Sequence, residues 1–264
     1  MPKDLKFFTE TSDILALASV KFDGNMKGES LFDGVKNRSN FLNNRLSYGA
    51  KIIMAGIEHN NQVKEVDRYC KEEIIKGVDG LVTQDNNIFL GVTFADCPFI
   101  LLSGMNFSKK QRVVGAAHCG YRGTVKNIAG EMIAKMEEKK AEAKYVKAVI
   151  GPGICEKCFE FGSDAPEIFS KYAEFLRSQN GTGKFLVDLK GIIKKQLIQS
   201  GVLENNIYVS DLCTFEDESL FSFRREKMDP NNIKAGIALI GIKKLQEKKV
   251  FSKKFPKLRA AHAM

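Results

Sequence analysis

The sequence predicts an α/β fold in which a single domain holds mixed β-sheets flanked by helices. Short apolar runs rich in β-branched residues alternate with amphipathic stretches over most of the 264 residues. No Pro/Ser-rich linker and no internal repeat divides the chain, which indicates one domain. Hydrophobic residues make up 44% and charged residues 28% of the sequence, which is ordinary for a globular protein and excludes a disordered chain.

Strands are expected where the short apolar, β-branched runs occur. In chain order these runs are residues 52–57, 80–83, 88–95, 99–102, 112–117, 146–150 and 207–210. Residues 1–50 show no pattern clear enough to place an element.

Helices are expected over residues 124–138, 165–178, 189–200 and roughly 234–247. Asp164 and Asp188 are candidate N-caps of the second and third helix, and Gly201 is a stop signal after the third. Residues 145–151 and 205–211 each follow a helix, which indicates αβ units that feed a mixed sheet.

The net charge of +9 is concentrated at the C-terminal end of the sequence. Residues 243–264 carry seven lysines and one arginine against one acid, a charge of +7, so residues 1–242 carry only +2. We therefore divide the chain into a catalytic domain, residues 1–242, and a basic tail, residues 243–264. Such a tail is more typical of a solvated chain end than of a nucleic-acid arm, so no specific nucleic-acid partner is expected.

The sequence predicts neither a membrane span nor an export signal. Asp96 interrupts the most apolar stretch, residues 88–102, and no apolar segment follows the basic residues at the N-terminus. We expect a cytoplasmic protein that is a monomer or a homodimer. The six cysteines should then be thiols, and they are Cys70, Cys97, Cys119, Cys155, Cys158 and Cys213.

Three segments break their local pattern and are candidates for a functional site. His59 lies in a polar turn after a strand, Cys97 follows Asp96 inside an apolar strand, and His118 precedes a glycine turn. Two imidazoles and a thiolate at strand ends could hold a catalytic zinc with an open fourth position. Spacing alone favours ordinary surface and core roles for these residues, because they do not stand at a local ligand spacing.

A second cysteine signal is Cys155-x-x-Cys158, which follows Gly151-Pro152-Gly153. One pair cannot make a four-sulfur zinc site, and the sequence contains no second pair. The H-x-E signature that accompanies P-C-x-x-C in the zinc deaminases of nucleobases is also absent. We interpret Cys155 and Cys158 as structural.

The sequence resembles the laccase-domain family, which is also described as YfiH-type polyphenol oxidoreductases and as purine nucleoside phosphorylases. The resemblance runs from about residue 37 to 241. It rests on His59 and on the motifs TFADCPFILL (93–102), AAHCGYRG (116–123), GPGI (151–154) and FSFRR (221–225). It implies a fold of the cysteine-hydrolase type, and it places His59, Cys97 and His118 on the family's metal-binding positions. Departures from the pattern include Pro98 directly after Cys97 and Tyr121 in place of tryptophan.

The resemblance implies a zinc-dependent purine nucleoside phosphorylase acting on adenosine, inosine, guanosine and methylthioadenosine, with adenosine deaminase activity. Its substrates would be purine nucleosides and phosphate. Cys97, His118 and Arg122 would be catalytic, and Arg122, Gly123 and Arg225 would bind phosphate, together with the backbone N–H groups at Gly123-Thr124. Copper remains the less favoured metal, because His59 and His118 would be used in one centre and only His262 would be left for a coupled oxygen-reducing cluster.

Two other functions stay open at the level of the sequence. The resemblance also implies a cysteine-type hydrolase or amidase that edits a cell-wall nucleotide precursor, with Cys97 as nucleophile and His118 as its base. Alternatively, the chain could be an interaction module that uses its basic tail. Metal content separates the hydrolase from the zinc-dependent phosphorylase, because a metal-bound thiolate is a poor free nucleophile.

Overall fold

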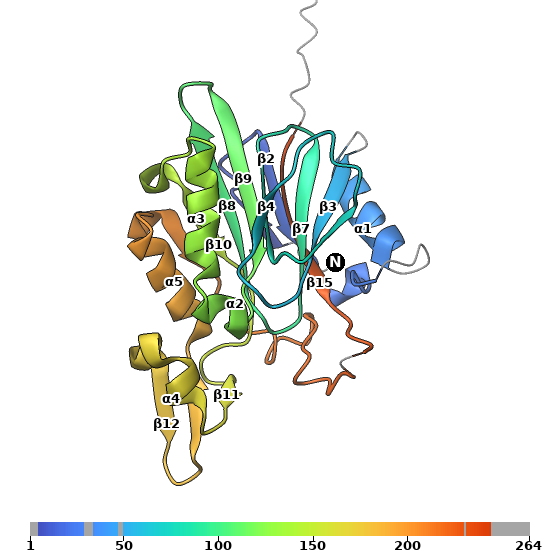
Figure 1. The fold of residues 1–264 in the computed structure, drawn as a ribbon. Helices are drawn as coiled ribbons and strands as arrows, with labels where there is room; N and C mark the ends of the chain where they lie inside the picture. The colour runs from blue at the N-terminus through green and yellow to red at the C-terminus, as the bar shows by residue number, and fades with distance from the viewer. Residues whose placement is uncertain (1–4, 29–33, 47–49, 230, 244–264) are drawn as a thin grey trace, which may run out of the picture.

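A computed structural model describes residues 5–28, 34–46, 50–229 and 231–243. Its centre is a pair of six-stranded sheets, each with parallel and antiparallel neighbours (Figure 1). The first sheet has the strand order β1-β2-β15-β7-β3-β5 and the second has the order β14-β10-β8-β9-β6-β4. The mixed sheets expected from the sequence are therefore confirmed.

The strands of the first sheet are β1 (Leu5–Phe7), β2 (Ile14–Ala18), β3 (Lys51–Gly56), β5 (Ile74–Lys76), β7 (Ile88–Phe94) and β15 (Gly236–Ile242). Those of the second are β4 (Val63–Glu65), β6 (Gly80–Thr83), β8 (Phe99–Asn106), β9 (Gln111–His118), β10 (Lys147–Ile150) and β14 (Ile207–Val209). A small third sheet has the order β11-β13-β12, from β11 (Glu160–Phe161), β12 (Leu176–Gln179) and β13 (Lys184–Val187).

Helices cover the outer faces of both large sheets (Figure 1). The helices are α1 (Gly34–Asn43), α2 (Tyr121–Val125), α3 (Ile128–Glu138), α4 (Ala165–Ile168) and α5 (Leu189–Gln199), with short 3-10 turns at Lys21–Asp23, Ala143–Tyr145, Ser170–Phe175 and Glu204–Asn206. The second sheet is covered by α3 and α5, whose buried residues share one core cluster with that sheet. The first sheet is covered by α1, through Phe41 and Leu42.

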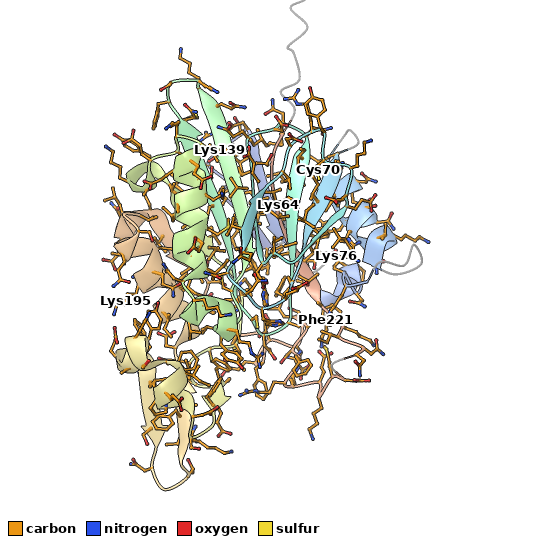
Figure 2. The ribbon with its side chains drawn as sticks, viewed as in Figure 1. Lys64, Cys70, Lys76, Lys139, Lys195 and Phe221 are labelled. Carbon is orange, nitrogen blue, oxygen red and sulfur yellow. The ribbon has the colours of Figure 1, made fainter. Side chains whose placement is uncertain are left out.

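Side chains from the two sheets fill the space between them and form the central core (Figure 2). Strand β8 shows why the strands read as continuous apolar runs. Phe99 and Leu101 face the other sheet, whereas Ile100 and Leu102 face the α3 side. Because successive side chains point to opposite faces, a strand covered on both faces needs apolar residues at every position.

The predicted helix over 234–247 is wrong over its described part. Residues 236–242 form β15, a central strand between β2 and β7, and every residue of it is buried. Its GIALIGI sequence alternates between the inter-sheet core and the α1 side, with Ala238 and Ile240 on the first face and Ile237 and Leu239 on the second. A short apolar run of this kind cannot be distinguished from a buried helix by periodicity alone.

The predicted helix over 165–178 is wrong in its second half. The α-helix stops at Ile168, Tyr172 has a non-helical φ of −137°, and the segment ends in strand β12. Asp164 stands at the N-cap but makes no side-chain cap bond. The other cap is confirmed, because Asp188 Oδ1 accepts the Gly191 N–H at 2.9 Å at the start of α5.

The predicted helix over 124–138 is divided into two. Asn127 has a φ of 68°, a left-handed conformation, and it separates α2 from α3. The basic tail lies outside the described residues from position 244 onward. Within the described ranges, no helix combines the length and the hydropathy needed to cross a bilayer.

Candidate active site

The three candidate ligands from distant parts of the sequence meet at one end of the two sheets. His59 lies in the turn after β3, Cys97 in the loop between β7 and β8, and His118 at the end of β9. Phe99 pairs with His118 in the β8–β9 ladder, so Cys97, two residues earlier, falls beside the imidazole. The ligand atoms of all three residues lie within 4.8 Å of one another.

Asp79, a buried aspartate that was not predicted from the sequence, accepts hydrogen bonds from His59 and His118. Asp79 is 0% exposed, and one of its oxygens accepts from His118 Nδ1 at 2.8 Å. The same carboxylate accepts the backbone N–H groups of Glu58, His59 and Asn60 at 3.0, 3.2 and 3.0 Å. It therefore supports the turn around His59, which has a φ of 58°, and leaves Nε2 of His118 to face a ligand.

The cluster without metal favours a thiolate beside an imidazolium. Burial opposes charge on Cys97, but the electrostatic interaction with His118 and hydrogen bonds from His118 and His59 lower the pKa of its thiol to about 6. Burial likewise opposes charge on His118, yet Cys97 and Asp79 raise the pKa of its imidazole to about 9. Both shifts favour the charged pair at neutral pH.

Two glycines leave the space that this cluster needs. A Cβ at Gly120 would lie 2.9 Å from both His59 Cδ2 and His118 Cε1 and 3.2 Å from Cys97 Sγ, so any other residue would crowd all three ligands. A Cβ at Gly123 would collide with the backbone oxygen of Asn60. Both positions therefore require the absence of a side chain.

The cluster opens into a cavity of about 760 Å³. Aromatic and aliphatic side chains form most of its wall, among them Phe94, Tyr121, Phe159 and Ile154. Arg122, Arg224, Lys27 and Arg38 also line it, and Asp96 is the one acid on this wall among the described residues. The Asp96 carboxylate is engaged, because it accepts the Thr214 hydroxyl at 2.7 Å and the Arg224 backbone N–H at 2.8 Å. The cavity therefore suits a ligand with an apolar body and an anionic part.

The residues predicted to bind phosphate differ in whether they line the cavity. Arg122 lines the cavity, with its guanidinium 4.7 Å from the centre of the Tyr121 ring. Gly123 does not line it, and the Thr124 N–H donates to the Gly120 carbonyl at 2.9 Å, so this N–H is already used within the chain. The close approach of the Asn60 backbone oxygen explains why position 123 is a glycine.

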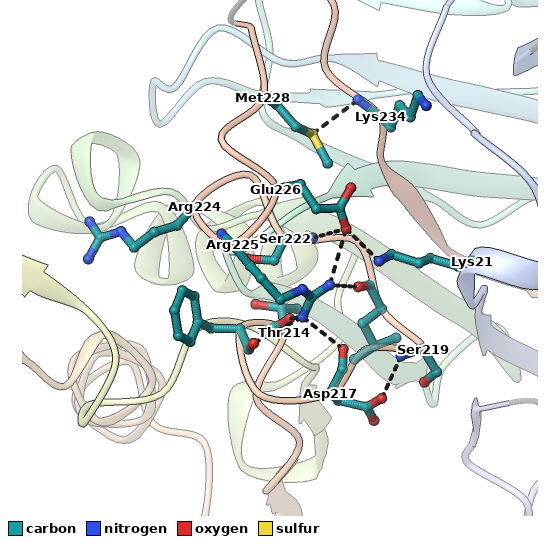
Figure 3. A network of polar contacts seen from close by, with 12 residues as sticks. Lys21, Thr214, Asp217, Ser219, Ser222, Arg224, Arg225, Glu226, Met228 and Lys234 are labelled. Atoms are coloured by element: carbon teal, nitrogen blue, oxygen red, sulfur yellow. Dashed lines mark hydrogen bonds and ion pairs between the residues drawn. The ribbon is translucent and has the colours of Figure 1, made fainter.

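Arg225 does not line the cavity, and Figure 3 shows its guanidinium directed toward Thr214 and Asp217. Its guanidinium donates to the carbonyls of Thr214, Phe215, Asp217 and Leu220 and pairs with Glu226 at 3.1 Å. It thus braces the 213–225 loop, and its neighbour Arg224 is the arginine that reaches the cavity wall. The double-arginine motif alone does not indicate which of Arg224 and Arg225 lines the cavity. Asp79 does carry a sequence signal, because it is an acid directly before the fully buried strand β6.

The ionisation of the cluster predicts a distinct pH profile for alkylation of metal-stripped protein. Cys97 should react with iodoacetamide in proportion to its thiolate, with a midpoint near the pKa of about 6. Free cysteine, with a pKa of ~8.5, should show its midpoint more than two pH units higher. Peptide mapping of the labelled protein across pH 5–9 measures this, and a Cys97 midpoint equal to that of free cysteine would contradict the charged pair.

Comparisons with known proteins agree with this architecture. The sequence profile described as multi-copper polyphenol oxidoreductase laccase matches residues 27–239. The solved structure of a hypothetical protein YfiH from Bacillus licheniformis has a TM-score of 0.80 at 22% identity, over 92% of this chain and 97% of that one. YlmD from Geobacillus stearothermophilus has a TM-score of 0.78 at 25% identity, over 88% and 93%.

Two curated relatives are similar in sequence over most of their length. A purine nucleoside phosphorylase YlmD from Bacillus subtilis is 31% identical over 74% of this chain and 73% of its own. An adenosine deaminase RL5 from an unknown prokaryotic organism is 32% identical over 70% of each. Together with the profile match over residues 27–239, these similarities show that the chain belongs to the family described as multi-copper polyphenol oxidoreductase laccase.

Proposed function

We propose that the protein is a zinc-dependent purine nucleoside phosphorylase that also deaminates adenosine. The observation that carries the proposal is that the His59, Cys97 and His118 cluster lines the same cavity as aromatic side chains and arginines. The curated relatives named for phosphorolysis and for adenosine deamination support it.

The chemistry of the donor set fits zinc. Two imidazoles and one thiolate are ligands that zinc prefers, and three protein ligands leave one position open, as in catalytic zinc sites. When bound by His59, Cys97 and His118, zinc would supply a Lewis acid at the wall of the cavity. The contact of Asp79 with His118 matches the carboxylate–histidine pairs that orient zinc ligands. The multi-copper chemistry in the family's description would need more histidines than the three in this sequence.

The cavity offers separate places for a purine and for phosphate. Its volume of about 760 Å³ lies within the range of small-molecule sites, and its aromatic side chains can pack on the faces of a base. Arg122 and Arg224 present guanidinium groups, which bind phosphate oxygens in a bidentate manner. We assign phosphate to Arg122 and Arg224 and withdraw Arg225 and Gly123 from that role.

Phosphorolysis needs these groups at defined moments. The bond between the sugar C1′ and the purine nitrogen breaks, the base leaves with the bonding electrons, and a phosphate oxygen forms the new bond to C1′. The sugar becomes cation-like on the way, so a phosphate held beside it by Arg122 stabilises the transition state as well as supplying the nucleophile. The apolar wall keeps out water, which would otherwise compete for the sugar.

The function predicts a strict requirement for phosphate in cleavage. Inosine incubated with the purified protein should give hypoxanthine and ribose 1-phosphate only when phosphate is present, whereas adenosine should be deaminated with or without it. Chromatography of the products measures both reactions. Cleavage to free ribose without phosphate would instead identify a nucleoside hydrolase.

Replacing Arg122 by alanine should separate the two activities. Loss of two charge-assisted hydrogen bonds should lower phosphorolysis by roughly 30- to 1000-fold and raise the KM for phosphate, with metal content unchanged. Deamination of adenosine does not use phosphate and should change by less than about threefold. Arg68→Ala is the matched control, because Arg68 is exposed, pairs with Asp85 on the surface and does not line the cavity. Equal loss of both activities in Arg122→Ala would contradict a phosphate role.

A cysteine hydrolase is the second candidate, and one observation favours it. Cys97, His118 and Asp79 form a thiol–imidazole–carboxylate chain of the kind found in cysteine hydrolases, with the thiol pKa lowered to about 6. In this function His59 would have no catalytic part, and the metal-free protein would be the active form. Activity in protein stripped of metal is therefore the measurement that favours this candidate.

We further propose that residues 1–242 act as one catalytic domain in the cytoplasm. The residues that line the cavity range from Lys27 to Ala235 and come from both large sheets, so neither sheet makes the site alone. A reducing compartment would keep Cys97 as the thiolate that the centre needs.

A further inference from the structure

A second group of metal-ligating side chains lies apart from the proposed active site. Cys155, Cys158, Cys213 and Glu216 each offer one ligand atom, and the four atoms lie within 4.8 Å of one another. Cys213 is buried, Cys155 and Cys158 are half-buried, and Glu216 is exposed. The proposed mechanism uses none of them.

The fold brings these residues together from two segments that are far apart in the chain. The strand pair β10–β14 is continued by a parallel bridge between Gly153 and Cys213. After the bridge the chain turns, and the Cys158 N–H donates to the Cys155 carbonyl at 3.0 Å, which brings both thiols of the C-x-x-C motif to one side. The sequence shows no second C-x-x-C motif, because the other two candidate ligands are one cysteine and one glutamate, Cys213 and Glu216.

We propose that Cys155, Cys158, Cys213 and Glu216 form a structural zinc site. Four donors fill all four positions of a tetrahedral zinc, as in structural zinc sites, with a carboxylate in the place that a fourth cysteine or a histidine usually takes. Around a tetrahedral zinc with Zn–S bonds of ~2.3 Å and a Zn–O bond of ~2.1 Å, a sulfur and an oxygen ligand lie about 3.6 Å apart. Cys158 Sγ is 3.7 Å from Glu216 Oε1, and all four ligand atoms lie within 4.8 Å of one another, so movements of the side chains alone could complete the shell. The three thiols release their protons when the metal binds.

Two neighbouring groups suit a centre with excess negative charge. The Cys155 backbone N–H donates to Cys213 Sγ at 3.3 Å, so this sulfur already acts as an acceptor, as metal-bound thiolates do. Lys190 is buried, and its ammonium is held by the carbonyls of Ser210 and Leu212 at 2.8 and 2.9 Å, beside Cys213. Its positive charge interacts with Cys213 and Cys155 and partly balances three thiolates and a carboxylate around one divalent ion.

The site would join two segments that form one side of the cavity. Ile154 and Phe159, on either side of the C-x-x-C motif, line the cavity, and Arg224 donates from its side chain to the Cys158 carbonyl at 3.2 Å. Thr214, next to Cys213, donates its hydroxyl to Asp96, which precedes Cys97. Bound zinc would therefore hold the cavity wall in position without touching substrate.

Metal stoichiometry tests this inference independently of the proposed function. Protein purified under reducing conditions should contain two zinc ions per chain by plasma mass spectrometry. Cys97→Ala and Cys158→Ser should each contain one. Cys70→Ser is the matched control and should keep two, because Cys70 belongs to neither cluster. One ion in the wild type that disappears in Cys97→Ala, or two ions that survive in Cys158→Ser, would overturn the second site.

Cobalt substitution provides a second readout on the wild-type chain, so the test does not depend on the folding of a variant. The sulfur-to-cobalt charge-transfer absorption grows with the number of thiolate ligands, which is three in the second site and one in the first. Glu216→Gln should keep this absorption but bind cobalt more weakly. Absorption equivalent to one thiolate, or an intact mass two hydrogens below the reduced value from a Cys155–Cys158 disulfide, would show that the cluster does not bind metal.

Hydrogen exchange tests the bracing role. In Cys158→Ser the amides of residues 154–159 and 213–217 should exchange faster, whereas those of α3 should not change. Unchanged exchange in both segments would show that they are held without the ion.

Discussion

Replacing Cys97 by alanine should remove the metal from the proposed active site and abolish turnover. The variant keeps only two of three ligands, His59 and His118, and two imidazoles do not hold zinc at the affinity of a three-ligand site. Since a bound ion would supply a Lewis acid beside the residues that hold it, its loss should lower phosphorolysis by at least ~1000-fold, which corresponds to about 4 kcal/mol. Metal analysis, product assays and circular dichroism measure the three consequences, and the fold should survive.

His59→Ala decides between the two candidate functions. For a zinc enzyme this variant should be as inactive as Cys97→Ala, because each removes one ligand. For a cysteine hydrolase, Cys97→Ala should be inactive whereas His59→Ala should keep most of its activity, since Asp79 contacts the other histidine, His118. Cys70→Ser is again the control for the loss of a thiol. A fully active, zinc-loaded His59→Ala variant would refute the proposed ligand set.

Asp79→Asn should cause the second large effect, on stability and on metal affinity together. The carboxylate accepts four hydrogen bonds, and an asparagine would turn an NH2 donor toward groups that are themselves donors. Because the site is fully buried, we expect a loss of about 3–5 kcal/mol in the free energy of unfolding. Metal affinity should fall by about 10- to 100-fold as His118 loses its orienting partner.

Urea unfolding and competition with a chelator measure these two effects. Glu138→Gln is the matched control, since Glu138 is 60% exposed and pairs with Lys135 on the surface, where such a pair contributes only about 0.3–0.5 kcal/mol. A loss in Asp79→Asn no larger than that of the control would contradict the role given to Asp79.

The pKa of Asp79 adds a pH dependence to the same comparison. Burial would raise the pKa of this carboxyl, but the hydrogen bonds from His118 and the backbone amides lower it below its ordinary value. The stabilisation is therefore complete above the unfolded pKa of ~3.9 and is lost as the pH falls through the folded value. Asp79→Asn should lack this part of the acid sensitivity, so its stability should approach that of the wild type in acid.

The fold class and most of the central strands could be predicted from local sequence patterns. β6, β7, β8, β9 and β10 lie where the short apolar runs predicted them, because a strand buried on both faces needs an apolar residue at almost every position. The N-cap at Asp188 was also predictable, because its hydrogen bond is made to Gly191, only three residues along the chain. The motifs also pointed to His59, Cys97 and His118, although their spacing alone did not.

Which of these residues lie close together depends on how the strands pair and how the sheets pack. Cys97 and His118 come together through the β8–β9 register, and Asp79 enters through the pairing of β6 with β9. The same packing turned residues 236–242 from an expected helix into the central strand β15, and it directed Arg224 rather than Arg225 to the cavity. Cys213 and Glu216 joined the C-x-x-C pair across the Gly153–Cys213 bridge. Local sequence patterns report backbone preference and the face that is buried, whereas the distance between residues remote in the chain depends on how whole sheets pair and pack.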